Sequence, residues 1–152
     1  MRALATALLI VVALATSGTV SAQDEGGVGA TIFVDPLTAS LRITPTRIQE
    51  RHQAMARATI TNSGPSATQT VTATLLIDPA GATIVGGATR TLSSIPARTA
   101  QNVEWRLCGR TRGGYLAMAI VTSSDAAGHV FRAETTAVLL EITPNRGAPS
   151  FC

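Results

Sequence analysis

An alternation of apolar and polar residues constrains the fold of this chain more than any other feature. Residues 70–77 alternate Thr with Val, Ala and Leu, residues 56–61 alternate Ala and Ile with Arg and Thr, and residues 102–107 alternate Val, Trp and Leu with polar residues. A period of two places successive side chains on opposite faces of a β-strand, whereas an amphipathic helix repeats every 3.6 residues. Because no convincing helical pattern follows residue 22, the sequence predicts an all-β fold of half-buried strands.

Turn-forming residues divide these runs at short intervals. Asn-Ser-Gly-Pro at 62–65, Asp-Pro-Ala-Gly at 78–81 and Asp-Ala-Ala-Gly at 125–128 combine residues that tolerate or fix turn conformations. About seven antiparallel strands are expected, near residues 39–44, 54–62, 69–77, 82–92, 100–107, 114–123 and 129–142. Seven strands in about 110 residues is typical of an immunoglobulin-like β-sandwich.

Three of the expected strands are irregular. The 82–92 run is broken by Gly86-Gly87, and the 129–142 run alternates imperfectly, as a bulge or a strand shared with a sheet edge would explain. Residues 115–121 are apolar on both faces. This last strand is therefore expected at the centre of a sheet, either covered on both sides or lying at a contact surface.

Two aromatic residues mark the sandwich. Trp105 falls on the fifth expected strand rather than the third, and no Cys…Trp…Cys spacing is present, so the chain is not an antibody-type domain. Tyr115 follows Gly113-Gly114 at the start of the sixth strand. That is the position of a tyrosine corner, and a plain core tyrosine is the alternative.

Residues 1–22 have the parts of a cleaved signal peptide. A positive start is followed by an apolar stretch at 3–15 that is too short to span a bilayer, and Val20 and Ala22 fit the small-residue rule before a cleavage site. The mature chain is therefore expected to be secreted or periplasmic and to lack a transmembrane segment. Its expected parts are a flexible lead at 23–38, the sandwich at 39–142 and a tail at 143–152.

Cys108 and Cys152 are the two cysteines of the chain. Oxidation is expected in an exported protein. The default is an intramolecular disulfide that ties the tail to the loop after the fifth strand and lets Phe151 cover the base of the sandwich. An intermolecular bridge through Cys152, or two free thiols, is the alternative.

The charge balance is nearly neutral. All 12 basic residues are arginines, and the chain has nine acidic residues. This small excess, without any basic run, argues against a nucleic-acid partner. Arg106, Arg110 and Arg112 cluster in the sequence, either as a solvated loop or as an anion-binding rim that faces cell-envelope polymers.

The sequence contains no recognisable pattern for catalysis or metal binding. His52 and His129 lack metal-ligand spacing, and Ser124, Asp125 and His129 lie within one hairpin, which does not readily give a catalytic triad. The acidic residues are scattered, and no phosphate-binding or dinucleotide motif is present. The sequence predicts no enzyme, no cofactor and no metal site.

Turn and core residues carry a resemblance to a known family. They are Thr-Ile-Thr-Asn-Ser-Gly at 59–64, Ile-Asp-Pro-Ala-Gly at 77–81, Val-Glu-Trp at 103–105 and Gly-Gly-Tyr at 113–115. This pattern resembles bacterial extracellular immunoglobulin-like modules of the CARDB type (cell-adhesion-related domains). The resemblance implies a spacer or adhesion unit without catalysis.

A second resemblance involves the first expected strand. Residues 41–48 (LRITPTRI) followed by 58–62 (ATITN) are similar to the first domain of periplasmic pilus-assembly chaperones. This resemblance implies that Arg47 anchors the terminal carboxylate of a client. A guanidinium group suits that role because it forms a bidentate, charge-assisted pair with a carboxylate.

The sequence as a whole predicts a non-catalytic exported module that binds or spaces at the bacterial cell envelope, with a protein or an envelope polymer as partner. One alternative is a chaperone-like module that binds a pilus subunit by edge-strand pairing. Another is an accessory subunit of a secreted hydrolase. The candidate partner-binding residues are Arg47, Arg106, Arg110 and Arg112.

Overall fold

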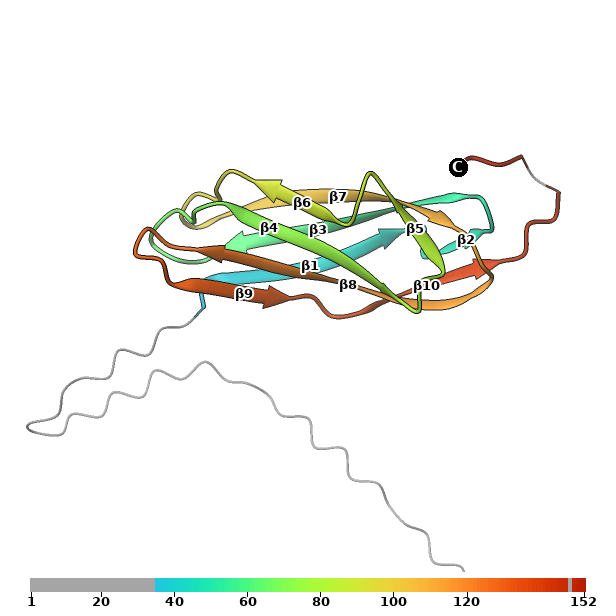
Figure 1. Cartoon of the computed structure of the whole chain (residues 1–152). Helices are drawn as coiled ribbons and strands as arrows, with labels where there is room; N and C mark the ends of the chain where they lie inside the picture. The colour runs from blue at the N-terminus through green and yellow to red at the C-terminus, as the bar shows by residue number, and fades with distance from the viewer. Residues whose placement is uncertain (1–34, 148) are drawn as a thin grey trace, which may run out of the picture. The chain divides into compact units, whose positions relative to one another are not determined.

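The computed structural model describes residues 35–147 and 149–152, which form two β-sheets packed face to face (Figure 1). The strands are β1 (Leu37–Thr44), β2 (Arg47–Gln49), β3 (Gln53–Asn62), β4 (Val71–Asp78), β5 (Ala82–Val85), β6 (Thr89–Leu92), β7 (Thr99–Gly109), β8 (Gly113–Ser124), β9 (Val130–Glu134) and β10 (Val138–Thr143). Sheet A has the order β1-β3-β7-β5. Sheet B has the order β2-β10-β8-β4-β6, with β9 also paired to β8.

The expected all-β, immunoglobulin-like sandwich is therefore confirmed. The strand pairs are antiparallel, apart from the parallel pair of β2 with β10. The predicted signal peptide at 1–22, and residues 23–34 of the predicted lead, lie outside the described residues. β1 begins at Leu37, so the last two residues of that lead belong to sheet A. No helix in the described part of the chain is long and apolar enough to cross a membrane.

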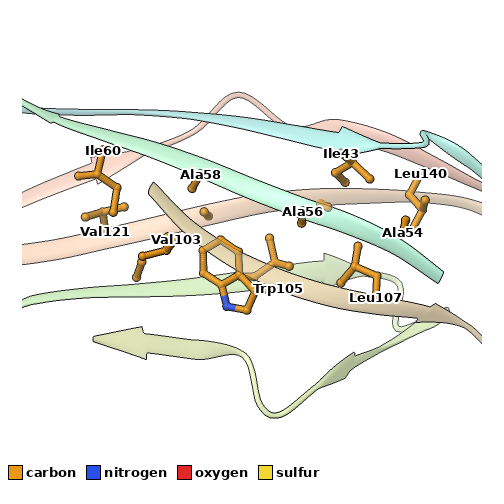
Figure 2. Close-up of a cluster of buried hydrophobic side chains, with 14 of the residues drawn as sticks. Ile43, Ala54, Ala56, Ala58, Ile60, Val103, Trp105, Leu107, Val121 and Leu140 are labelled. Atoms are coloured by element: carbon orange, nitrogen blue, oxygen red, sulfur yellow. The ribbon is translucent and has the colours of Figure 1, made fainter. Parts of the chain in front are cut away.

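The interior combines small side chains of β3 and the large ring of Trp105 on β7 with branched aliphatic side chains from both sheets. Ala54, Ala56 and Ala58 are buried on the inner face of β3, and Ala56 lies opposite Trp105 in the register (Figure 2). Trp105 is 0% exposed, and its Nε1 donates a hydrogen bond to the Ala88 carbonyl at 2.6 Å. A buried indole with its N–H satisfied contributes apolar area without an unpaired donor.

Two crossings of the chain between the sheets differ from the sequence prediction. One precedes a strand that was not predicted, and the other divides a predicted strand in two. After Thr44 the chain passes from sheet A to sheet B and forms the short strand β2, which the sequence analysis missed. The predicted 82–92 strand is two strands, because β5 pairs with β7 in sheet A and β6 pairs with β4 in sheet B. Gly86 and Gly87 make this second crossing with φ values of 78° and 87°, which glycine adopts without a steric penalty.

The predicted 129–142 strand is also divided. β9 and β10 pair with different halves of β8, and Thr135 lies between them. The Ala119 N–H donates to Thr135 Oγ1, and the Thr135 N–H donates to the Ala119 carbonyl. The Thr135 hydroxyl thus takes the place of a main-chain carbonyl as the acceptor of the Ala119 N–H. This break in the pairing is the physical reason why residues 129–142 alternate imperfectly.

Tyr115 has the hydrogen bonds of a tyrosine corner. Its hydroxyl donates to the Thr111 carbonyl at 2.8 Å and approaches the Arg112 carbonyl at 3.1 Å, both a few residues upstream. Gly81 lies against the ring, and its carbonyl accepts the N–H groups of Arg110 and Thr111. Tyr115 therefore fastens the β7–β8 loop to the turn that precedes β5.

Candidate functional site

The outer face of sheet A carries a concentration of arginines, and we call it the arginine face. It consists of the outward side chains of four neighbouring strands: Arg42 and Thr44 of β1, Met55 and Arg57 of β3, Glu104 and Arg106 of β7, and Val85 of β5. The register forms two rows, Arg42–Arg57–Glu104 and Thr44–Met55–Arg106–Val85. Neighbouring side chains on such a face lie about 4.5–5.5 Å apart at Cβ, and diagonal ones about 7–8 Å.

The charges on this face are not balanced. Arg57 Nε donates to Glu104 Oε1 at 2.7 Å, and Arg57 Nη2 lies 2.5 Å from the same oxygen. Arg42 is directly opposite Arg57, and Arg106 is diagonal to Arg57. Among the residues that the structure describes, neither Arg42 nor Arg106 forms a salt bridge, so the face has three arginines and a single carboxylate, which is paired with Arg57.

Two depressions meet at Met55 on the arginine face. One has a volume of about 320 Å³ and is lined by Arg42, Thr44, Met55 and Arg57. The other, of about 370 Å³, is lined by Met55, Val85, Arg90, Glu104 and Arg106. The guanidinium group of Arg90 is held by backbone carbonyls, including those of Gly87 and Glu104. The two depressions share Met55 and lie next to each other on the outer face of sheet A.

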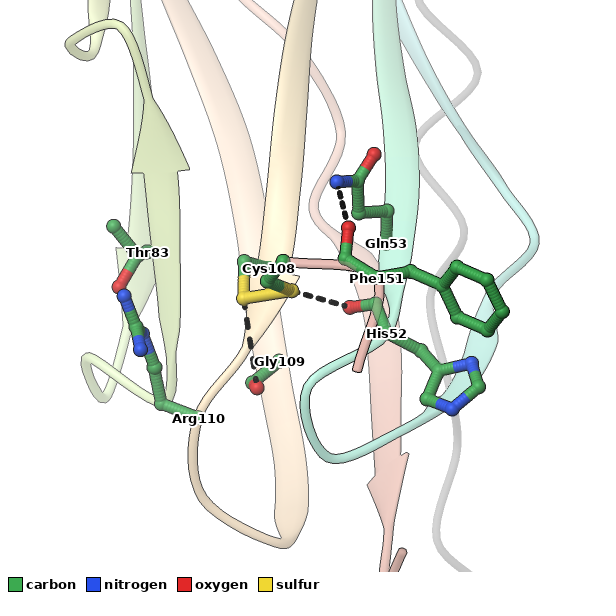
Figure 3. Close-up of a disulfide and its surroundings, with 8 residues drawn as sticks. His52, Gln53, Thr83, Cys108, Gly109, Arg110 and Phe151 are labelled. Atoms are coloured by element: carbon green, nitrogen blue, oxygen red, sulfur yellow. Dashed lines mark hydrogen bonds between the residues drawn. A yellow bond between two sulfur atoms is a disulfide. The ribbon is translucent and has the colours of Figure 1, made fainter. Parts of the chain in front are cut away.

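The predicted arginine cluster is divided by the fold. Arg106 lies on β7 and faces outward with the arginine face, whereas Arg110 and Arg112 are in the β7–β8 loop. Arg110 Nε donates to Thr83 Oγ1 at 2.8 Å (Figure 3), and the Arg112 main-chain N–H donates to Glu50 Oε1 at 3.2 Å. Sequence reasoning missed Arg42 and Arg57, although both occupy polar positions of alternating strands.

Arg47 lies on β2, at the edge of sheet B. Its Nη2 is 3.5 Å from Glu141 Oε1 on the paired strand β10, and both side chains are largely exposed. A carboxylate ligand of Arg47 would compete with Glu141 for this guanidinium group.

The base of the sandwich is closed by the disulfide between Cys108 and Cys152, whose Cα atoms are 5.9 Å apart (Figure 3). The Phe151 N–H donates to the Arg51 carbonyl at 2.9 Å, and Gln53 Nε2 donates to the Phe151 carbonyl. The Phe151 ring packs edge-on against His52 at 5.1 Å between centroids but remains 59% exposed. The expectation that Phe151 covers the base is therefore wrong, because the ring lies on the side of His52 and outside the core.

The outer face of sheet B is apolar around β8, and we call it the leucine face. It consists of Leu76 on β4, Leu116, Met118 and Ile120 on β8, and Leu139 on β10. Leu139 lies directly opposite Leu116, and Leu76 directly opposite Met118. Leu116 is 53% exposed and Leu139 is 56% exposed. The strand 115–121 is central in sheet B, as expected, but no described residue covers its outer face, so its position at a contact surface stays a prediction.

The Asp125–His129 pair at the opposite end of the sandwich organises a turn. Asp125 Oδ1 accepts the N–H groups of Ala127 and His129, and Oδ2 lies 2.8 Å from His129 Nδ1. The hydrogen bond from the His129 side chain is the main cause that lowers the pKa of Asp125 from its usual value. Both carboxylate oxygens are thus engaged within the hairpin.

A depression of about 420 Å³ beside this hairpin has Asn62 in its wall. The Asn62 amide is occupied: Nδ2 donates to the carbonyls of Ser66 and Ile95, and Oδ1 accepts the Gly64 N–H. Within residues 35–147 and 149–152, no three His, Cys, Asp or Glu side chains are grouped closely enough to hold a metal ion.

Comparison with solved structures identifies the fold. A fragment of Escherichia coli alpha-2-macroglobulin is 12% identical with a TM-score of 0.60, over 72% of this chain and 17% of that one. A CARDB domain from Pyrococcus furiosus, solved as a complex with di-metal ions, is 14% identical with a TM-score of 0.52, over 70% of this chain and 87% of that domain. The solution structure of the same domain also has a TM-score of 0.52.

These similarities confirm the predicted resemblance to CARDB modules at the level of the fold. The sequence matches no protein-family profile and no curated protein. This chain spans 17% of the alpha-2-macroglobulin fragment. The similarity to pilus-assembly chaperones stays a prediction from the sequence.

Proposed function

We propose that this chain is an exported, non-catalytic binding module of the bacterial cell envelope that holds a protein partner on the leucine face. The observation that carries the proposal is the Leu116–Leu139 pair, in which two large apolar side chains lie side by side and are each more than half exposed. Single exposed leucines are common on protein surfaces, but a contiguous apolar patch marks a contact surface.

The surroundings of the leucine face fit a protein partner. Two salt bridges border it, Arg47–Glu141 near Leu139 and Arg132–Glu134 near Ile120. An apolar centre with a charged rim is the arrangement found in protein–protein interfaces. Because the patch lies on hydrogen-bonded strands, it is presented to a partner with little loss of conformational entropy.

Site-specific photo-crosslinking in the source bacterium tests the proposal. A photoreactive residue in place of Leu116 should give one discrete adduct with another protein, and Leu139→Asp in the same chain should abolish it. Thr91 is the matched control position because it is exposed on the outer face of sheet B but lies on β6, outside the leucine face. No adduct at 116, or the same adduct at 116 and 91, would contradict the proposal, as would an adduct of two copies of this chain.

Edge-strand pairing is the second candidate, and one observation favours it. β1 is the edge strand of sheet A, and a groove of about 440 Å³ lies beside it, lined by Leu41–Thr46 and Val138. An extended client strand would pair with the open edge of β1. A photoreactive residue at Leu41 distinguishes the two candidates, because edge pairing predicts an adduct at 41 and none at 116.

A further inference from the structure

We propose that the arginine face is a binding site for an acidic polysaccharide, separate from the protein-binding leucine face on the other sheet. The central residues are Arg42, Arg57 and Arg106. Thr44 and Met55 lie beside them, in the same register row as Arg106. Nothing in the linear sequence groups these three arginines, since they lie on three different strands.

The arginine face carries an excess of positive charge. Like charges directly opposite each other on neighbouring strands oppose sheet formation, and Arg42 and Arg57 stand in that relation. Glu104 is bonded to Arg57, which leaves Arg42 and Arg106 on either side without a carboxylate among the described residues. An anionic group placed between Arg42 and Arg57, or between Arg57 and Arg106, would relieve this repulsion.

The guanidinium groups of the arginine face suit the acidic groups of a polysaccharide. A guanidinium group offers a planar fork of donors that matches the two oxygens of a carboxylate or the oxygens of a sulfate ester. Arg57 already holds Glu104 through Nε and Nη2, so the guanidinium groups open to a ligand are those of Arg42 and Arg106, on the strands at either side of Arg57. Two cations separated by one strand suit a chain that repeats its acidic groups. The two depressions share Met55, and between them they are lined by Arg42, Arg57 and Arg106, so an extended chain that lies along both would reach the three arginines.

A neutral polar surface lies beside the arginines. The next row of outward side chains is Ser40, Thr59 and Asn102, which are directly opposite one another on β1, β3 and β7. The Thr59 hydroxyl donates to Asn102 Oδ1 at 2.7 Å. Hydroxyl and amide groups beside guanidinium groups match the hydroxyls and acidic groups of a sugar acid, and Met55 offers an apolar surface to a sugar ring.

Other polyanions fit this face less well. Single-stranded nucleic acids are held through aromatic side chains on which bases stack, and the described outward residues of sheet A include no aromatic ring. A folded acidic protein needs a buried apolar centre of several hundred Å² on each partner, whereas the arginine face offers only Met55 and Val85.

The test is a binding titration with defined polymers and two matched double variants. Polygalacturonate (carboxylates) and dextran sulfate (sulfates) are the polysaccharide probes, and polyglutamate and an oligothymidylate are the competitors, each at two salt concentrations. R42Q/R106Q removes two charges from the arginine face. R98Q/R146Q removes two charges from exposed loop positions outside both faces, so the two variants have the same net charge.

We expect at least one polysaccharide to bind, with an affinity that falls as salt rises because the contacts are ionic. R42Q/R106Q should weaken binding at least tenfold, and R98Q/R146Q should change it less than twofold. Both pairs of arginines are exposed, and R42Q/R106Q is expected to melt no lower than the wild type. The comparison of melting temperatures shows whether the variant is folded.

Three results would overturn the proposal. The first is failure of both polysaccharides to bind at low salt. The second is equal weakening by the two double variants, which would show that net charge alone drives binding. The third is tighter binding of polyglutamate or oligothymidylate than of either polysaccharide.

Discussion

Substitution of Gly81 by alanine should disrupt the tyrosine corner at the base of the sandwich. A Cβ atom added to Gly81 would lie 1.8 Å from Cζ of Tyr115 and 2.0 Å from Cε1. The ring is buried and its hydroxyl is bonded to the loop carbonyl of Thr111, so it cannot move away without loss of these contacts. The substitution therefore has to displace the ring or shift the turn before β5.

The cost has two parts. Forcing an extra methyl group into a packed interior destabilises by about 1–3 kcal/mol. Loss of the Tyr115 hydroxyl bonds adds about 1 kcal/mol. We expect Gly81→Ala to lower the free energy of unfolding by about 2–4 kcal/mol, which moves the urea midpoint down by about 1 M or more.

A double-mutant cycle in urea tests the cause of this loss. In the Tyr115→Phe background the ring remains, so Gly81→Ala should still destabilise. In the Tyr115→Ala background the ring is absent, and Gly81→Ala should be neutral or stabilise by about 0.4–1 kcal/mol through the unfolded state. An equal cost of Gly81→Ala in all three backgrounds would refute the packing argument.

Three further predictions follow from the core, the disulfide and the Asp125–His129 turn. Cys108→Ala/Cys152→Ala should lower stability by about 4 kcal/mol, the chain-entropy value for a separation of 44 residues, and a loss under about 1 kcal/mol in urea would contradict it. Trp105→Phe should cost about 1–3 kcal/mol, because the smaller ring leaves unfilled space in the core and the hydrogen bond to the Ala88 carbonyl is lost while that carbonyl keeps the Leu75 N–H, and unfolding followed by circular dichroism checks this. Because the pKa of Asp125 is lowered in the folded protein, ionised Asp125 stabilises the fold above its usual pKa of 3.8. The stability advantage of the wild type over Asp125→Asn should therefore be present at pH 5 and shrink as the pH falls below 3.8; an advantage that grows on acidification would contradict the assignment.

Local alternation predicted the central strands well. β3, β4, β7 and β8 lie within two residues of the expected ranges because a period of two sets both the strand and its buried face. The same pattern cannot show which sheet a strand joins. Gly86-Gly87 was visible as a break, but the exchange of sheets depends on whether residues 89–92 pair with β4 or with β7, which is a non-local choice.

The arginines show the same limit at the level of the site. Arg106, Arg110 and Arg112 are close in sequence, but the fold places Arg106 on a strand face and the other two in a loop. Arg42 and Arg57 are 15 residues apart in sequence and directly opposite in space because β1 and β3 pair antiparallel. Finding that pair from the sequence would require the register of β1, which the chain segment at 45–52 between the strands does not specify.

Nuclear magnetic resonance of the ¹⁵N-labelled protein, titrated with polygalacturonate or dextran sulfate, is the direct test of where the binding site lies. We expect amide shift changes at Arg42, Arg57 and Arg106, with the amides of Leu116 and Leu139 unchanged on the other sheet. Shift changes centred on Arg110 and Arg112 in the β7–β8 loop, or on the leucine face, would contradict it.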